Sequence, residues 1–304
     1  MHEDKPAVIT TMLTRKCPYN CSYCLIKRKK SVDLPASYWI DVGLNLGKDI
    51  HFNFYGGEPQ VYGDLSSLVS QLNGHNFNYS FNSACPSPAK LEKFARVNNL
   101  RNWTPSIDTL YDSRSLNGLE TLKRLRKVGV PDLMAEIVVF PKMVSEAQKV
   151  VDFLIRENFW LSITFLSWGK SSNYDSFPRA KPNWSATDKK QISQLRRSII
   201  DYPKLHGNLK SYLELWDCDE FLYQQLKPCN GSIVCFNPDS DGQMRLCRDI
   251  KGNLVTKWNA LEASKNISAF FCDWIKDYES QCLGCSWACP FFAKDLQEQI
   301  RHEI

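Results

Sequence analysis

The 304-residue sequence lacks the features that would point to a membrane or to nucleic acid. No apolar run approaches the roughly 18 residues that a bilayer-spanning helix needs. Residues 1–13 carry acidic side chains and no long apolar core, so they are unlike a secretory signal. The net charge is only +5, and the basic run Lys27–Lys30 is short enough to be a solvated face. We therefore expect a cytoplasmic protein that binds neither membrane nor nucleic acid.

Twelve cysteines stand out against these absences. In a reducing compartment, cysteines usually bind metals or take part in catalysis, and they rarely form disulfides. Cys17, Cys21 and Cys24 lie close together, and eight more cysteines fall between Cys218 and Cys289. Cys85 alone lies in the long middle of the chain. This distribution predicts two metal-binding regions that flank a cysteine-poor body.

The body of the chain predicts six β-strands that alternate with helices. The predicted strands cover residues 7–13, 49–57, 78–84, 104–110, 132–140 and 160–168. The helices between them cover residues 35–47, 63–74, 87–98, 116–130 and 145–158. Such alternation predicts a parallel sheet with crossover helices, and six units are too few for a closed eight-stranded barrel. We therefore expect an α/β fold, a partial (β/α)6 TIM-like barrel, whose ligands bind at the carboxyl ends of the strands.

The composition divides the chain into three parts. Residues 1–168 form the predicted barrel core. Residues 169–216 are polar and serve as a connector, with a predicted helix at 187–202. Residues 217–304 hold most of the cysteines and few long periodic segments. We expect this last part to be a small cysteine-rich domain.

The first cysteine group has the spacing Cys-x3-Cys-x2-Cys and follows the first predicted strand. Three thiolates can bind three irons of a [4Fe–4S] cluster and leave the fourth iron open for another ligand. The alternative is a zinc site that a distant fourth residue completes. Zinc sites are usually built from paired Cys-x2–4-Cys knuckles, so the triplet favours the cluster.

Two segments together resemble the radical S-adenosylmethionine (SAM) enzymes. Residues 17–24, Cys-Pro-Tyr-Asn-Cys-Ser-Tyr-Cys, resemble that family's cysteine signature, including the aromatic Tyr23 before the last cysteine. Residues 54–59, Phe-Tyr-Gly-Gly-Glu-Pro, resemble its Gly-Gly-Glu motif. The resemblance implies that SAM binds the open iron and that Gly56, Gly57 and Glu58 hold its amino group.

The resemblance extends to three further strand ends. It implies that Ser106 and Asp108 contact the SAM ribose and that Arg114 meets the SAM carboxylate, because a guanidinium pairs strongly with carboxylates. Asn82 or Ser83 would contribute to the same pocket. The alternative for each is a polar group that is satisfied at the end of its strand.

The C-terminal cysteines resemble the auxiliary iron–sulfur domains called SPASM and twitch. The residues that carry this likeness, including the ligands it implies, are Cys229, Cys235, Gly242, Cys247, Cys282, Cys285 and Cys289. A full SPASM domain has more cysteines, so we expect one auxiliary [4Fe–4S] cluster, with two clusters or zinc as alternatives. We expect Cys85, Cys218 and Cys272 to be small buried hydrophobic residues.

The resemblance implies a reaction class. A radical SAM oxidoreductase cleaves SAM reductively to a 5′-deoxyadenosyl radical, which abstracts a hydrogen from the substrate, with flavodoxin or ferredoxin as electron donor. Our first interpretation is oxidation or crosslinking of a side chain in a ribosomally made peptide (RiPP maturation). We expect the barrel core or a partner to bind that peptide, because no separate recognition domain precedes the first predicted strand.

Two other interpretations stay open. One is a dehydrogenase or rearrangement enzyme that acts on a small metabolite. The other is a non-enzymatic iron–sulfur or zinc module, against which the Gly-Gly-Glu segment argues. Candidate bases after hydrogen abstraction are Asp249, Asp217 and Asp219. Aromatic residues that could line the substrate cavity are Trp168, Tyr174 and Trp287.

Overall fold

The computed structural model describes residues 8–21, 24, 32–165, 184–206, 235–245 and 255–273. Six strands follow the predicted pattern: β1 (Val8–Met12), β2 (His51–Tyr55), β3 (Asn78–Ser83), β4 (Asn102–Pro105), β5 (Asp132–Val139) and β6 (Trp160–Phe165). The helices are α1 (Ala36–Leu46), α2 (Leu65–Gly74), α3 (Pro88–Asn98), α4 (Ser113–Lys127), α5 (Val144–Arg156) and α6 (Ala186–Ile199), with a short 3-10 turn η1 (Pro59–Val61).

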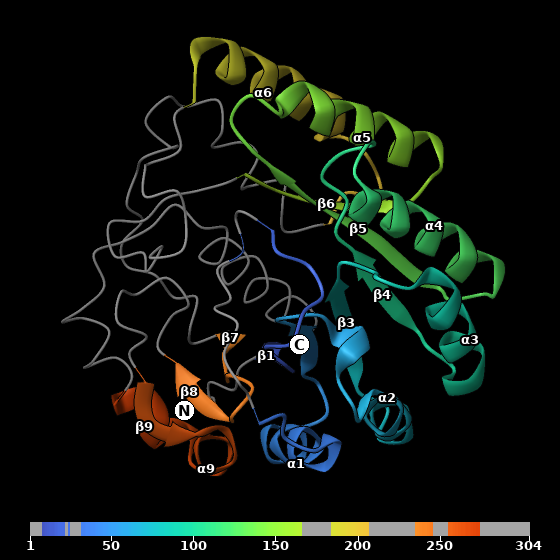
Figure 1. The fold of residues 1–304 in the computed structure, drawn as a ribbon. Coiled ribbons are helices and arrows are strands. Elements are labelled where there is room, and N and C mark those ends of the chain that lie inside the picture. Colours follow the sequence, from blue (N-terminus) through green and yellow to red (C-terminus); the bar gives the residue numbers. More distant parts are fainter. Residues whose placement is uncertain are drawn as a thin grey trace.

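The six strands form one parallel sheet in the order β6-β5-β4-β3-β2-β1. The helices lie in an arc along its outer face, as Figure 1 shows. This arrangement is a half-barrel, so the predicted partial TIM-like fold is confirmed. All six strands run in one direction, and their carboxyl ends therefore meet at one edge of the sheet.

The two faces of the sheet differ in chemistry because successive side chains of a strand point to opposite sides. The outer face packs aromatic rings against the helices; Phe52, Phe54 and Phe81 stack in sequence on neighbouring strands. The inner face is largely polar. Strand pairing places these residues on it: Thr10, Asn53, Ser80, Asn82, Thr104, Glu136 and Ser162. The half-barrel therefore presents hydrogen-bonding groups on its concave side.

Local sequence signals explain where the helices begin. The Asp112 carboxylate caps α4 by accepting a hydrogen bond from the Ser115 amide at 2.8 Å. Ser185 and Asp188 form a capping box at the start of α6. Pro88 occupies the first turn of α3, where a missing amide hydrogen costs little. No helix in the described ranges is both long and apolar enough to cross a bilayer.

The predicted strand 104–110 was placed too late, because β4 ends at Pro105. The next amides continue the pairing irregularly: Ser106 donates to the Ser83 carbonyl and Ile107 to the Glu136 carbonyl, both at 2.8 Å. The amide of Asp108 then donates to the Ser115 hydroxyl in α4. The chain leaves the sheet here because the Asp108 amide is hydrogen-bonded to a side chain of α4 and not to a neighbouring strand.

The C-terminal part contributes elements that the sequence pattern did not predict. These are β7 (Cys235–Phe236), β8 (Gln243–Arg245), β9 (Val255–Asn259) and α9 (Ala260–Lys265). The short β7 pairs in parallel with β1 and extends the sheet to seven strands. In Figure 1, α9 lies beside α1, and the Leu261 amide donates to the Tyr38 hydroxyl at 3.2 Å. Part of the cysteine-rich region is thus attached to the edge strand of the barrel.

Candidate functional site

The cysteine loop, residues 13–24, leaves the carboxyl end of β1. Its three cysteines, Cys17, Cys21 and Cys24, are half-exposed and not disulfide-bonded, and the Cys24 amide donates to the Cys21 carbonyl at 3.1 Å. Burial raises the pKa of the Cys17 thiol, and the negative charges of Glu58, Cys24 and Cys21 raise it further, whereas a backbone hydrogen bond from Tyr19 lowers it. The charges of Cys21 and Cys24 act on Cys17, so the three thiols lie near one another on the loop.

The described residues contain no set of three His, Cys, Asp or Glu side chains that converge on a single metal ion. A cubane cluster makes a different demand, because each of its cysteines binds a separate iron atom. Three thiols spread along one accessible loop match that demand in ligand type and number.

The two glycines after β2 allow the chain to pack against this loop. Gly56 has a φ of +91°, and a side chain there would start 2.1 Å from the Met12 Cγ. Gly57 has a φ of +30°, and its added Cβ would lie 2.2 Å from the Lys16 carbonyl oxygen. Glycine is required because any side chain would displace the backbone just before Cys17. The Gly-Gly pair is thus the support on which the cysteine loop rests.

Glu58 is completely buried, and its carboxylate is held by protein groups. Oε1 accepts hydrogen bonds from the Gln60 amide at 2.9 Å and the Ser83 hydroxyl at 2.7 Å, and Oε2 accepts one from the Ala84 amide at 2.7 Å. Burial raises the pKa of the Glu58 carboxyl, and these hydrogen bonds oppose that shift. The side chain ties the turn after β2 to the end of β3, while the Glu58 amide donates to the Lys16 carbonyl at 2.8 Å.

Asn82 and Ser106 lie close to a carboxylate that the sequence analysis did not single out. The Asn82 amide group donates to Glu136 Oε2 at 3.0 Å, and Ser106 pairs with Glu136 across the β4–β5 boundary. All three residues are half-buried on the inner face. One signal was present in the sequence: Glu136 is the acidic residue inside the apolar strand Leu-Met-Ala-Glu-Ile-Val-Val.

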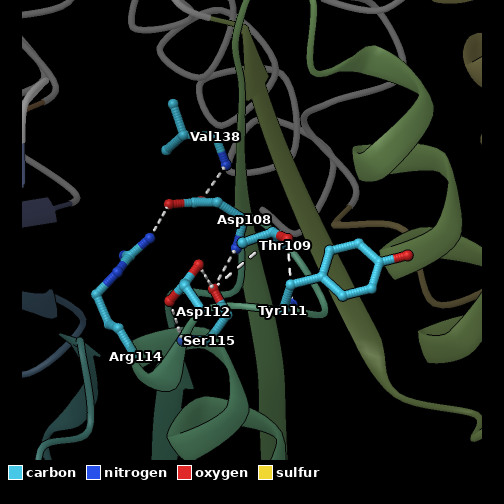
Figure 2. Close-up of polar contacts among 7 residues, drawn as sticks. All are labelled: Asp108, Thr109, Tyr111, Asp112, Arg114, Ser115 and Val138. Carbon is cyan, nitrogen blue, oxygen red and sulfur yellow. Dashed lines mark hydrogen bonds and ion pairs between the residues drawn. The ribbon is translucent and has the colours of Figure 1, made fainter.

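Asp108 and Arg114 form a buried ion pair at the turn between β4 and α4, shown in Figure 2. Their side chains are 6% and 12% exposed. Asp108 Oδ1 also accepts a hydrogen bond from the Val138 amide at 2.9 Å, so both carboxylate oxygens have protein partners. Asp108, which was predicted to contact the SAM ribose, is therefore paired with Arg114, which was predicted to bind the SAM carboxylate.

The start of α4 joins this ion pair to the cysteine loop. Ser115 Oγ donates to Asp112 at 2.9 Å and accepts the Asp108 amide at 3.2 Å, which closes the turn seen in Figure 2. Asn117, two residues further along α4, donates to the Tyr19 hydroxyl at 3.4 Å. The cysteine loop and the Arg114 turn are therefore neighbours at the carboxyl edge of the sheet.

Several predicted site residues lie outside the described residues, and their roles stay predictions. They are Tyr23, Cys229, Cys247, Asp249, Cys282, Cys285 and Cys289, together with Asp217, Asp219, Trp168, Tyr174, Trp287 and Cys218.

Three cysteines outside the cysteine loop lie within the described residues. The backbone of Cys235 belongs to β7. Cys85 is buried as expected, and burial raises its pKa to about 12. The same expectation for Cys272 was wrong: it is exposed, because Phe270 and Phe271 occupy the buried side of its helix.

A second buried ion pair was also missed by the sequence analysis. Arg15 pairs with Asp239, whose side chain is fully inaccessible to solvent. Arg15 lies two residues before Cys17, and Asp239 lies in the turn after β7. No sequence signal joins two residues 224 positions apart.

Solved structures with a similar fold share little sequence with the chain. Streptococcus suis SuiB bound to the precursor peptide SuiA aligns with a TM-score of 0.64 and 16% identity, over 85% of this chain and 63% of SuiB. SuiB bound to S-adenosylmethionine aligns with a TM-score of 0.62 and 16% identity, over 85% and 64%. The protein anSMEcpe, with bound AdoMet and the Cp18Cys peptide, aligns with a TM-score of 0.59 and 14% identity, over 86% and 79%. These likenesses show the fold, and the chain spans less than two thirds of SuiB.

A comparison with curated protein sequences finds no significant match. The model of the Radical SAM superfamily matches residues 11–154, from β1 to near the end of α5. The match includes the cysteine loop, the Gly-Gly-Glu turn and the Asp108–Arg114 turn. Residues 11–154 of this chain are thus similar to the radical SAM domain.

Proposed function

We propose that this protein is a radical SAM enzyme that modifies a peptide. One observation carries the proposal: within a radical SAM domain, the three-cysteine loop rests on the Gly-Gly-Glu turn at the carboxyl edge of the half-barrel. A structural zinc module would need neither that turn nor the Asp108–Arg114 turn beside it.

The residues of the cysteine loop fit a [4Fe–4S] cluster in number, ligand type and accessibility. Cys17, Cys21 and Cys24 would each bind one iron. When bound, such a cluster with SAM on its open iron supplies one-electron cleavage of SAM to methionine and a 5′-deoxyadenosyl radical, which takes a hydrogen atom from the substrate; reduced flavodoxin or ferredoxin provides the electron. The protein contributes the binding, the orientation and the exclusion of water.

We assign the binding of SAM to the turns that surround the loop. The backbone of Gly56 and Gly57 would receive the amino group, and the buried Glu58 would hold that backbone in place. Arg114 would bind the SAM carboxylate, and Ser106 and Asn82 would contact the ribose. Asp108 forms an ion pair with the Arg114 guanidinium and accepts a hydrogen bond from the Val138 amide. In our proposal its role is therefore to orient the Arg114 side chain toward the SAM carboxylate. A guanidinium that is already oriented loses less entropy when it pairs with a carboxylate.

The peptide substrate is supported by the proteins that share the fold. SuiB was solved with its precursor peptide SuiA, and anSMEcpe with the Cp18Cys peptide. We propose oxidation or crosslinking of a peptide side chain, with an auxiliary [4Fe–4S] cluster held by the C-terminal cysteines. An auxiliary cluster can accept the second electron that such an oxidation releases.

The reaction class is tested by SAM cleavage. Protein reconstituted with iron and sulfide, reduced anaerobically and given SAM should form 5′-deoxyadenosine and methionine in equal amounts. The Cys17/Cys21/Cys24→Ala variant should lose about four irons per chain and all cleavage, because no thiolate remains to bind the cluster. The exposed Cys272→Ser is the matched control and should keep both. Tetrahedral zinc in the cysteine loop of anaerobically purified protein would contradict the proposal.

The substrate class needs a separate experiment. Peptides deuterated at candidate side chains should transfer deuterium into 5′-deoxyadenosine. Transfer from a deuterated metabolite and from none of the peptides would show that the substrate is a small molecule.

A further inference from the structure

The segment that leads into Cys17 is held from two sides. On one side is Gly57, where an added Cβ would lie 2.2 Å from the Lys16 carbonyl oxygen and 2.8 Å from the Thr14 carbonyl oxygen. The Glu58 amide, on the same side, donates to the Lys16 carbonyl. On the other side is the turn after β7, residues 237–242, which we call the C-terminal turn. The Met12 amide donates to the Pro238 carbonyl of this turn at 3.3 Å, and Arg15 forms its ion pair with Asp239.

The C-terminal turn is built as a rigid support. The Asp239 amide donates to the Gln243 carbonyl at 2.9 Å, and the Gly242 amide donates to the Asp239 carbonyl at 2.8 Å. Asp239 Oδ1 accepts the Ser240 amide at 2.7 Å, while Oδ2 meets Arg15. Gly242, with a φ of +80°, packs so closely on α1 that an added Cβ would lie 2.6 Å from the Tyr38 hydroxyl. Contacts within the C-terminal turn therefore hold the Asp239 carboxylate in place, independently of its ion pair with Arg15.

The Arg15 side chain is 13% exposed and its charge is largely removed from water. A buried guanidinium that loses its carboxylate is costly, so the chain around it moves to regain solvent. The chain that would move is the cysteine loop, because Arg15 precedes Cys17 by two residues. The β7 strand pairs with β1 at Val8 and Ile9, so the turn that follows β7 is anchored beside the strand that leads into the loop.

We propose that Asp239, acting through Arg15, is a positioning residue that sets the conformation of the cysteine loop from the C-terminal region. The proposal rests on the proposed function only for its consequence, namely that the loop so positioned carries the catalytic cluster. The site in the radical SAM domain would then be incomplete without a residue that lies 85 positions beyond the matched range of 11–154.

The first test uses cluster-free protein and does not depend on activity. The rate at which iodoacetamide alkylates Cys17 is followed by peptide mass spectrometry, with amide hydrogen exchange over residues 13–21. Asp239→Asn keeps an oxygen for the Ser240 amide and removes the charge that holds Arg15. We expect alkylation of Cys17 to become on the order of tenfold faster, with faster exchange in the loop.

The matched control is Asp241→Asn in the same turn. Asp241 is exposed, and its carboxylate accepts only a short-range hydrogen bond from the Gln243 amide among the contacts described. This variant should alkylate at the wild-type rate. The double variant Arg15→Gln/Asp239→Asn should be no faster than either single variant, because both changes remove the same contact. Wild-type rates for Asp239→Asn and Arg15→Gln would overturn the proposal.

Arg15→Lys is a second variant in case Asp239→Asn does not fold. It keeps the charge and loses the planar fork, so the loop should loosen by a smaller factor in a folded protein. In reconstituted protein, Asp239→Asn should change the electron paramagnetic resonance spectrum of the reduced cluster, and Asp241→Asn should not.

The two proposals can fail separately. If the loop loosens in Asp239→Asn but wild-type protein never cleaves SAM, the proposed function fails and the positioning role stands. If wild-type protein cleaves SAM but Asp239→Asn leaves the alkylation and exchange of the loop unchanged, the positioning role fails and the proposed function stands.

Discussion

Two buried arginine–aspartate pairs flank the candidate site, and they are built in different ways. Arg114 and Asp108 are six residues apart, in the single connection between β4 and α4. Arg15 and Asp239 are 224 residues apart, on opposite sides of the β1–β7 contact. Exposure does not distinguish them, since their side chains are 12% and 6% exposed in the first pair and 13% and 0% in the second.

The difference lies in what must fold before each pair can form. The Asp108 pair needs one turn, which Asp112 and Ser115 close through a helix cap. The Asp239 pair needs β7 to reach the edge of the half-barrel, which closes a loop of more than two hundred residues. Closing such a loop costs chain entropy that only the native packing offsets. The first pair is therefore a local feature of the half-barrel, and the second couples the half-barrel to the C-terminal region.

The largest expected effect comes from breaking each pair. Asp108→Ala and Asp239→Ala each leave a guanidinium buried without its carboxylate, so each should lower the free energy of unfolding by about 3–5 kcal/mol. Urea denaturation of cluster-free protein measures this. Hydrogen exchange should separate the two: Asp108→Ala should release amides of the β4–α4 turn, and Asp239→Ala those of both β1 and the C-terminal turn. Identical exchange patterns would remove the distinction between a local and a long-range pair.

Gly57, on the other side of the cysteine loop from Asp239, should give the next largest loss of stability. Gly57→Ala places a Cβ 2.2 Å from the Lys16 carbonyl at a positive φ, so we expect a loss of about 2–5 kcal/mol in urea denaturation. Gly129→Ala is the control, because Gly129 also has a positive φ but has no atom within 4 Å of the added Cβ. It should lose about 1–2 kcal/mol from backbone strain alone. Equal losses would show that the close approach to Lys16 contributes nothing.

The half-buried, neutral His51 contrasts with the two charged pairs. Burial, with a smaller contribution from the nearby His206, lowers the pKa of His51 to about 4, and its Nε2 lies 2.9 Å from the Ser80 hydroxyl. Below pH 6.5 the unfolded chain binds a proton that folded His51 does not. The stability of cluster-free protein should therefore fall, by about 3 kcal/mol from this residue between pH 7 and pH 4.

His51→Gln should remove most of this pH dependence when the unfolding free energy is measured at several pH values. Some dependence should remain, because burial also lowers the pKa of His206. The exposed His75→Gln is the control and should keep the wild-type slope. An unchanged slope in His51→Gln would mean that another group sets the acid response.

The smallest effect is expected at an ion-pair network on the surface. Glu92 contacts Arg96 at 3.0 Å and Arg124 at 2.9 Å, in a setting open to solvent. Water and salt screen such pairs, so Glu92→Gln should leave the urea midpoint unchanged within error. A loss as large as that of Asp239→Ala would show that burial does not explain the difference between the pairs.

Local patterns in the sequence were sufficient for the alternation of the half-barrel and for the cysteine loop. Strand and helix periods are set by neighbours a few residues apart, which is why β1 to β6 and α1 to α6 were predicted, apart from the placement of β4. That strand was misplaced because the Ser115 hydroxyl, a tertiary partner, takes the Asp108 amide from the sheet. The turn chemistry of Gly56 and Gly57 was also visible, although their close approach to Met12 and to the Lys16 carbonyl was not.

The sequence by itself therefore determined the half-barrel, the cysteine loop and the glycine turn, because three thiols, two glycines and alternating periods are local properties. Only the tertiary structure decided that Glu136 stands beside Asn82, that Asp108 turns to Arg114, and that Asp239 reaches Arg15. The physical reason is burial. A charged group is held inside a protein by whichever partner the packing brings to it, and distance along the chain does not reveal that partner.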